Sequence, residues 1–109
     1  MNATISVTQA EELREKNPST QFLDVREPEE VALGRISNAQ HIPLNSIPEN
    51  IDRISKEGIL IVYCHHGMRS QKAVEYLQAK GFKNCLNLSG GIHAWSTDID
   101  PSIPCYWVR

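Results

Sequence analysis

Apolar and polar residues alternate along this chain in two kinds of segment. Short segments rich in β-branched and large apolar residues occur at residues 5–7, 21–26, 59–63 and 82–88, and such segments are typical of strands. Between them apolar residues recur every three or four positions, as at Ala73, Val74 and Leu77, which is typical of a helix with one buried face. Strands that alternate with helices predict an α/β fold with a parallel sheet covered on both faces.

Capping residues give approximate bounds for the predicted helices. Thr8 and Glu11 have the spacing of a capping box, which predicts a helix that runs to about Lys16. Pro28 suits the first turn of a short helix that Gly34 ends. The remaining helices are predicted over residues 46–54, through residues 73–77 with an end at Gly81, and over residues 92–95 after a turn at Gly90 and Gly91; residues 98–109 are expected to be extended.

Length and charge restrict the possible classes of protein. The chain has 109 residues, which predicts one doubly wound domain over residues 1–109 with four or five parallel strands. A net charge of -2 gives no electrostatic footprint for nucleic acid or an anionic membrane. The N-terminus has no signal-peptide pattern and no segment is apolar enough to span a bilayer. The three cysteines are odd in number, unlike a disulfide framework, so we expect a cytoplasmic protein with reduced thiols.

Cys64 stands where chemistry is most expected. It directly follows the predicted central strand, and Gly67 and Arg69 follow it before the next helical pattern begins. Ligands bind at the carboxyl edge of parallel sheets. Backbone N–H groups of a tight loop and the positive end of a helix dipole favour a thiolate over a thiol. The sequence therefore predicts that Cys64 is a nucleophile.

Several separate motifs, taken in order, resemble the rhodanese homology family, and the resemblance covers nearly the whole chain. They lie at residues 24–26 with Glu30, 34–36, 39–43, 63–70 and 88–95. The chain thus resembles a single-domain rhodanese, a thiosulfate sulfurtransferase-like protein. The resemblance implies a central parallel sheet flanked by helices, in agreement with the apolar pattern.

The resemblance also implies a mechanism and a set of site residues. Cys64 is expected to accept a sulfane sulfur from thiosulfate or a persulfide and to pass it from a persulfide to a thiol or cyanide. The expected active loop wraps this sulfur with backbone N–H groups and consists of His65, His66, Gly67, Met68 and Arg69. Arg69 is expected to close the loop and meet anionic oxygens of the donor. The expected supporting residues are Asp24, Arg26 and Ser70.

Some of these residues have a second, purely structural interpretation. Asp24 and Arg26 either brace the active loop or form a structural ion pair. His65 and His66 either touch the donor at the rim or face solvent. His41 is expected to form a structural hydrogen bond. Cys85 is expected in the core, Cys105 as a spare thiol or one that resolves an oxidised Cys64, and Trp95 and Trp107 as packing residues.

Two positions depart from the family pattern, and no cofactor or metal is expected. Arg35 stands where the family usually has histidine, and Asn38 stands where it has glycine; Asn tolerates positive φ, so the turn should survive. Cys64, His65 and His66 are adjacent, and adjacent residues rarely share one tetrahedral metal centre.

Three functions remain open at this point. The leading hypothesis is sulfur transfer with a small-molecule donor. Phosphatase or arsenate reductase chemistry on the same fold is less favoured, because four residues separate Cys64 from Arg69 and the similar phosphatases have five. The third is a sulfur-relay carrier or binding module that acts with a protein partner. The sequence leaves the physiological donor and acceptor open.

Overall fold

Five parallel strands form the centre of the computed structural model, which describes residues 3–106. The strands are β1 (Thr4–Ile5), β2 (Gln21–Asp24), β3 (Gln40–His41), β4 (Leu60–Tyr63) and β5 (Cys85–Leu88). Their order is β1-β5-β4-β2-β3. Strand β4 therefore lies in the middle, paired with β2 on one side and β5 on the other.

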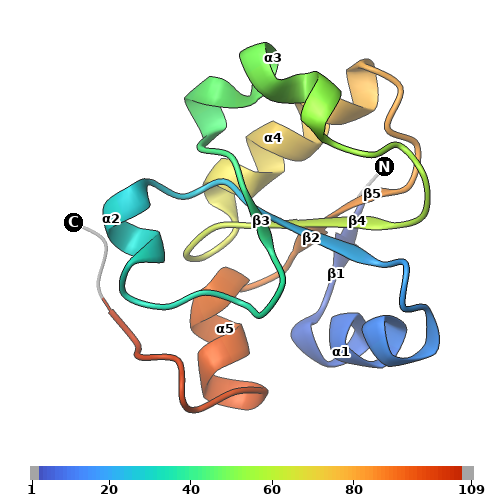
Figure 1. The fold of residues 1–109 in the computed structure, drawn as a ribbon. Coiled ribbons are helices and arrows are strands. Elements are labelled where there is room, and N and C mark those ends of the chain that lie inside the picture. The colour runs from blue at the N-terminus through green and yellow to red at the C-terminus, as the bar shows by residue number, and fades with distance from the viewer. Residues whose placement is uncertain (1–2, 107–109) are drawn as a thin grey trace.

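Helices cover both faces of the sheet (Figure 1). They are α1 (Val7–Lys16), α2 (Pro28–Val31), α3 (Ile47–Asn50), α4 (Met68–Ala79) and α5 (Gly91–Asp98), with 3-10 turns at Leu44–Ser46 and Ile51–Arg53. In Figure 1, α3 and α4 lie on one face of the sheet and α1 and α5 on the other. Helix α2 lies beside the end of the sheet at which β4 ends.

Alternate residues of β4 enter two separate cores. Leu60 and Val62 belong to the apolar cluster that includes Val74 of α4, whereas Ile61 and Tyr63 belong to the cluster that includes Trp95 of α5. All four strand residues are buried, because both faces of the sheet are covered. This confirms the predicted doubly wound α/β domain and explains why the strand is apolar without interruption.

Helix α1 begins earlier than predicted. The capping box consists of Ser6 and Gln9, not Thr8 and Glu11: Gln9 N–H donates to Ser6 Oγ and Ser6 N–H donates to Gln9 Oε1, both at 3.1 Å. A helix that begins at Val7 buries Val7 and Ala10 on one face. The predicted strand over residues 5–7 was wrong at its end, because Val7 is helical.

The predicted helix over residues 46–54 is broken into short pieces. Pro48 has no N–H to continue a helical ladder, and the Nδ2 of Asn50 donates to the carbonyl oxygen of Ser46 at 2.8 Å. The apolar spacing was nevertheless informative, since Ile47 and Ile54 are buried.

Three further element ends differ from prediction. Strand β5 begins at Cys85 rather than residue 82, because Phe82 N–H donates to the Leu77 carbonyl and completes the end of α4. Strand β2 ends at Asp24, whose carboxylate accepts the N–H of Arg26 at 3.0 Å. Helix α5 extends to Asp98, and the following residues turn rather than extend: Ile103 N–H donates to the Asp100 carbonyl.

Candidate active site

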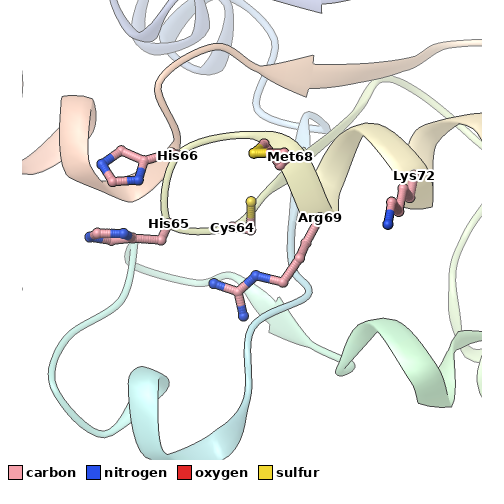
Figure 2. Close-up of a pocket in the computed structure, with 6 residues that line it drawn as sticks. All are labelled: Cys64, His65, His66, Met68, Arg69 and Lys72. Carbon is pink, nitrogen blue, oxygen red and sulfur yellow. The ribbon is translucent and has the colours of Figure 1, made fainter. Parts of the chain in front are cut away.

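Cys64 lies between the end of β4 and the N-terminus of α4. Its sulfur accepts the N–H of Gly67 at 3.1 Å and the N–H of Ser70 at 3.4 Å. Figure 2 shows the loop arching around this sulfur, with the His65 and His66 rings at one side and Arg69 and Lys72 at the other. Free N–H groups at a helix N-terminus favour a negative charge on the sulfur. Gly67 is the one residue of the expected loop whose N–H is seen to reach the sulfur, and the second donor is Ser70, which was expected only as a supporting residue.

Gly67 is needed for its backbone conformation. It is the N-cap of α4 and has φ of 118°, a region that residues with a side chain rarely adopt. A Cβ at this position would meet its nearest neighbour at 3.6 Å, which is an ordinary contact. Space for a side chain is therefore available at Gly67, and torsional freedom is the reason for the glycine.

A buried polar network holds the first turn of α4 beside Cys64. Ser70 Oγ lies 3.4 Å from the Cys64 sulfur and donates to Asn87 Oδ1 at 2.5 Å. The Nδ2 of Asn87 donates to the Gly67 carbonyl at 3.1 Å. Asn87 lies on β5, so the network ties the Cys64 loop to the neighbouring strand. Sequence reasoning missed Asn87, although a polar residue in a predicted buried strand is a signal.

Arg26 and Asp24 form a fully buried ion pair. The Arg26 Nη2 to Asp24 Oδ2 distance is 2.6 Å, and both side chains are inaccessible to solvent. Burial disfavours the charged guanidinium, yet the hydrogen bonds to Asp24 and Tyr106 outweigh it and raise the pKa of Arg26. Arg26 also donates to the carbonyl oxygens of Glu30 and Gly34. It therefore holds the segment that carries Glu30.

Glu30 links this buried pair to Arg69. Its carboxylate accepts two hydrogen bonds from Arg69, from Nη1 to Oε1 at 2.5 Å and from Nη2 to Oε2 at 2.8 Å. The hydrogen bond from Arg69 lowers the pKa of Glu30 to about 2, against an opposing effect of burial. Tyr106 Oη, 2.8 Å from Arg26 Nη1, donates to Glu30 Oε2 at 3.1 Å. Arg26 thus reaches the Cys64 loop through Glu30 and Arg69, and also through Tyr106. The ion pair is therefore structural and supports the loop at the same time.

A cavity of about 300 Å³ opens over the Cys64 loop. Its lining residues are Cys64, His65, His66, Met68, Arg69 and Lys72. Arg69 and Lys72 bring positive charge from one side of α4 (Figure 2). Sequence reasoning missed Lys72; the signal was its position four residues after Met68, which places both on one helix face.

His65 does not face solvent, so that alternative is wrong for this residue. Its ring is only 2% exposed and packs between the rings of His66 and Tyr106, with centroid distances of 4.1 and 4.2 Å. Burial lowers the pKa of His65. His66 is exposed, as expected of a rim residue. Tyr106, from the segment after α5, was not predicted to reach this site.

Gly91 allows α5 to approach the Cys64 loop. It has φ of 59°, and a Cβ there would collide with the carbonyl oxygens of His65 and Cys64. The N–H of Ile92 donates to the Cys64 carbonyl at 2.9 Å. The predicted turn at Gly90 and Gly91 thus leads directly into α5, and Gly91 lets this helix lie against the Cys64 loop.

The remaining sequence predictions concern residues away from the cavity. His41 Nε2 donates to the Arg26 carbonyl at 2.7 Å, which confirms its structural hydrogen bond. Asn38 has φ of 66°, so the turn survives. Burial raises the pKa of Cys85 to about 12. Trp95 is buried against Phe22, as expected of a packing residue. Cys105 is exposed, and Trp107 lies outside the described residues. The structure gives no account of Arg35.

Comparisons with known proteins agree with the fold. A protein-family model described as "Rhodanese-like domain" matches residues 6–98 of the chain. The chain is 38% identical over 91 residues to "Thiosulfate sulfurtransferase GlpE" of Ectopseudomonas mendocina (strain ymp), covering 84% of this chain and 82% of that one. It is 40% identical over 75 residues to a "Sulfurtransferase" of Allochromatium vinosum, covering 69% and 70%. The crystal structure of a rhodanese-like domain protein from Staphylococcus aureus aligns with a TM-score of 0.80 and 39% identity, covering 87% and 91%.

The chain belongs to the rhodanese-like domain family. The relatives named as sulfurtransferases support a transferase of the rhodanese type. Within residues 3–106 no helix has the length and apolar character needed to cross a bilayer.

Proposed function

We propose that this protein moves a sulfane sulfur from thiosulfate or a low-molecular-weight persulfide to a thiophilic acceptor through a persulfide on Cys64. One observation carries the proposal: the Cys64 sulfur accepts hydrogen bonds from the N–H groups of Gly67 and Ser70. Cys64 also lines the cavity. Such donors stabilise a thiolate and a persulfide anion without a general base. The reduced cytoplasmic setting expected from the sequence is part of this proposal.

The reaction has two displacement steps. The Cys64 thiolate attacks the outer sulfur of thiosulfate; the sulfur–sulfur bond of the donor breaks and sulfite leaves with the bonding electrons. Cys64 then carries a persulfide. Cyanide or a thiolate attacks the terminal sulfur, the bond to the Cys64 sulfur breaks, and its electrons restore the thiolate. The products are thiocyanate or a new persulfide, as in ping-pong covalent catalysis.

Arg69 and Lys72 are the groups proposed to attract an anionic donor. Both line the cavity, and a guanidinium matches the geometry of an oxyanion. Glu30 neutralises part of the Arg69 charge. Lys72 therefore supplies the cavity's second cation, and we assign it a share of donor attraction.

A sulfur-relay carrier is the second candidate, and the exposure of Met68 favours it. This side chain is 81% exposed at the mouth of the cavity. Flexible, exposed methionine side chains are common at protein-binding surfaces. A carrier of this kind would keep its persulfide until a protein partner docked beside Met68. Phosphatase chemistry ranks lower, since the short Cys64–Arg69 loop suits a single sulfur better than a phosphate group.

Intact-protein mass spectrometry tests the proposal. Wild type and Cys64→Ser are mixed with thiosulfate, and cyanide is then added. We expect wild type to gain one sulfur atom that cyanide removes, and Cys64→Ser to gain none. An adduct with glutathione persulfide but none with thiosulfate would favour the carrier. No adduct from either donor, or an adduct that persists in Cys64→Ser, would overturn the proposal.

A further inference from the structure

Three of the four histidines of the chain meet at one side of the Cys64 loop. His65 and His66 belong to the loop, and His93 belongs to the first turn of α5. Their ring centroids are 4.1 Å apart for His65 and His66, 5.6 Å for His65 and His93, and 5.1 Å for His66 and His93. One nitrogen of each ring lies within 4.8 Å of one nitrogen of each other ring. We call these three residues the histidine cluster.

His65 carries an unsatisfied polar group into this cluster. The residue is 2% exposed, and among residues 3–106 no hydrogen bond of good geometry reaches either ring nitrogen, although the backbone of Tyr106 lies near the ring. Buried polar atoms are nearly always paired, because leaving one unpaired costs about 1–3 kcal/mol. An apolar ring would fill the space between His66 and Tyr106 without this cost. A metal ion coordinated by an imidazole nitrogen would explain why this buried position holds a histidine.

The backbone fixes the position of the cluster. His93 N–H donates to the His65 carbonyl at 3.1 Å, so the two residues are held by a main-chain contact rather than by their side chains. Gly91 makes this approach possible, because any Cβ there would collide with the loop carbonyls. A main-chain hydrogen bond therefore joins the two parts of the cluster, the Cys64 loop and the first turn of α5.

We propose that His65, His66 and His93 bind a divalent d-block cation of borderline softness, such as Zn²⁺. Adjacent residues rarely share one metal centre, but here the His65 and His66 rings lie on the same side of the loop, with centroids 4.1 Å apart, and His93 comes from a separate element. Imidazole is a preferred ligand for Zn²⁺, Cu²⁺ and Ni²⁺. Three histidines with a fourth open position form a known arrangement for zinc.

The distances are compatible with this proposal after small side-chain rotations. Zinc–nitrogen bonds of about 2.0–2.1 Å at tetrahedral angles place the ligand nitrogens roughly 3.4 Å apart. His66 is exposed and His93 is half-buried, so both rings have room to close toward the buried His65.

The cation would lie beside the cavity, because His65 and His66 also line it. The open coordination position would then be accessible to a water molecule or to an anion in the cavity. Cation binding does not depend on sulfur transfer, so the two proposals fail independently.

Calorimetric titration with Zn²⁺ tests the cluster in a Cys64→Ser, Cys105→Ser background, which removes the accessible thiols as competing ligands. In the same background, His93→Asn and His66→Asn each remove one imidazole ring from the cluster. Neither histidine is fully buried, so both substitutions should leave the fold intact. His41→Gln is the matched control, because it removes a histidine outside the cluster and retains an Nε2 donor for the Arg26 carbonyl.

We expect one Zn²⁺ per chain and an affinity that falls by about tenfold or more in His93→Asn and in His66→Asn. His41→Gln should bind like its parent. In the parent, NMR signals of three imidazole rings should shift on addition of Zn²⁺ and that of His41 should not. No saturable binding, or equal affinity in all four proteins, would overturn the proposal.

Discussion

Arg69 and Glu30 join α4 to α2 through two parallel hydrogen bonds, Nη1 to Oε1 at 2.5 Å and Nη2 to Oε2 at 2.8 Å. This bidentate geometry is the one by which arginine recognises an oxyanion. The carboxylate of Glu30 therefore occupies the groups of Arg69 that an anionic donor would use. The charge of the cavity is set by this pair as well as by Lys72.

Glu30→Gln should strengthen the use of thiosulfate. Removal of the carboxylate charge frees Arg69 to attract the dianionic donor, and we expect the KM for thiosulfate to fall about twofold to fivefold, in line with ~0.4–1 kcal/mol for a partly exposed pair. Arg69→Ala should raise the KM for thiosulfate. Steady-state thiosulfate:cyanide kinetics measure both changes.

A persulfide donor without an oxyanion provides the control for these two variants. Its KM should change little in Glu30→Gln and less than that of thiosulfate in Arg69→Ala. Equal losses for both donors in Arg69→Ala would mean that Arg69 holds the loop rather than the donor.

The ionisation of Glu30 should also make the free energy of unfolding depend on pH. Its pKa is lowered from 4.5 to about 2 in the folded protein, so the ionised form is stabilised by folding. This contribution is fully present above about pH 5 and is lost as the pH falls toward 2. We expect Glu30→Gln to lower the free energy of unfolding by about 1–2 kcal/mol at neutral pH, less than the full shift because Arg69 is partly exposed. Near pH 2 the two proteins should be equally stable.

Urea unfolding at both pH values measures this difference. Glu29→Gln is the matched control, since Glu29 is exposed on the same helix. A loss of stability that is the same at both pH values would show that Glu30 contributes by packing and not by charge.

Cys85 should be chemically silent in the folded protein. Burial raises the pKa of this thiol to about 12, and only a thiolate reacts with alkylating agents. We expect iodoacetamide at mildly alkaline pH to label the exposed Cys105 and to leave Cys85 unlabelled until urea unfolds the chain. Peptide mass spectrometry locates the label. Labelling of Cys85 and Cys105 at similar rates under native conditions would refute this.

Gly91→Ala should be strongly destabilising and Gly81→Ala only moderately so. Both glycines have positive φ, so both substitutions incur a conformational cost of about 1–2 kcal/mol. Only at Gly91 does the added Cβ collide with backbone atoms; at Gly81 its nearest neighbour is the end of the Lys56 side chain at 3.4 Å.

We expect Gly91→Ala to cost more than Gly81→Ala by about 1–3 kcal/mol, the usual penalty for forcing atoms into a packed region. The midpoint of urea unfolding provides the comparison. Equal effects would mean that the close approach of α5 to the Cys64 loop adds nothing to stability.

Local rules placed the parts of the site that lie on one continuous segment. The apolar run before Cys64, the positive-φ Gly67 and the following helix all depend on neighbouring residues, so residues 59–70 were predicted in the right order of elements. Element ends were less accurate where two local signals competed. Ser6 and Thr8 both had capping-box partners, and the choice between them was made by the burial of Val7 against the sheet.

The sequence by itself determined the fold class, the family and the position of Cys64 at the carboxyl edge of a strand. These follow from periodicity and from motifs whose members are close in the chain. Only the tertiary structure decided which distant side chains meet: Arg69 with Glu30, His65 with His93, and Tyr106 with Arg26. Such contacts depend on strand order and on how closely α5 approaches the loop. Neither leaves a local pattern in the sequence, because each arises from the packing of whole elements.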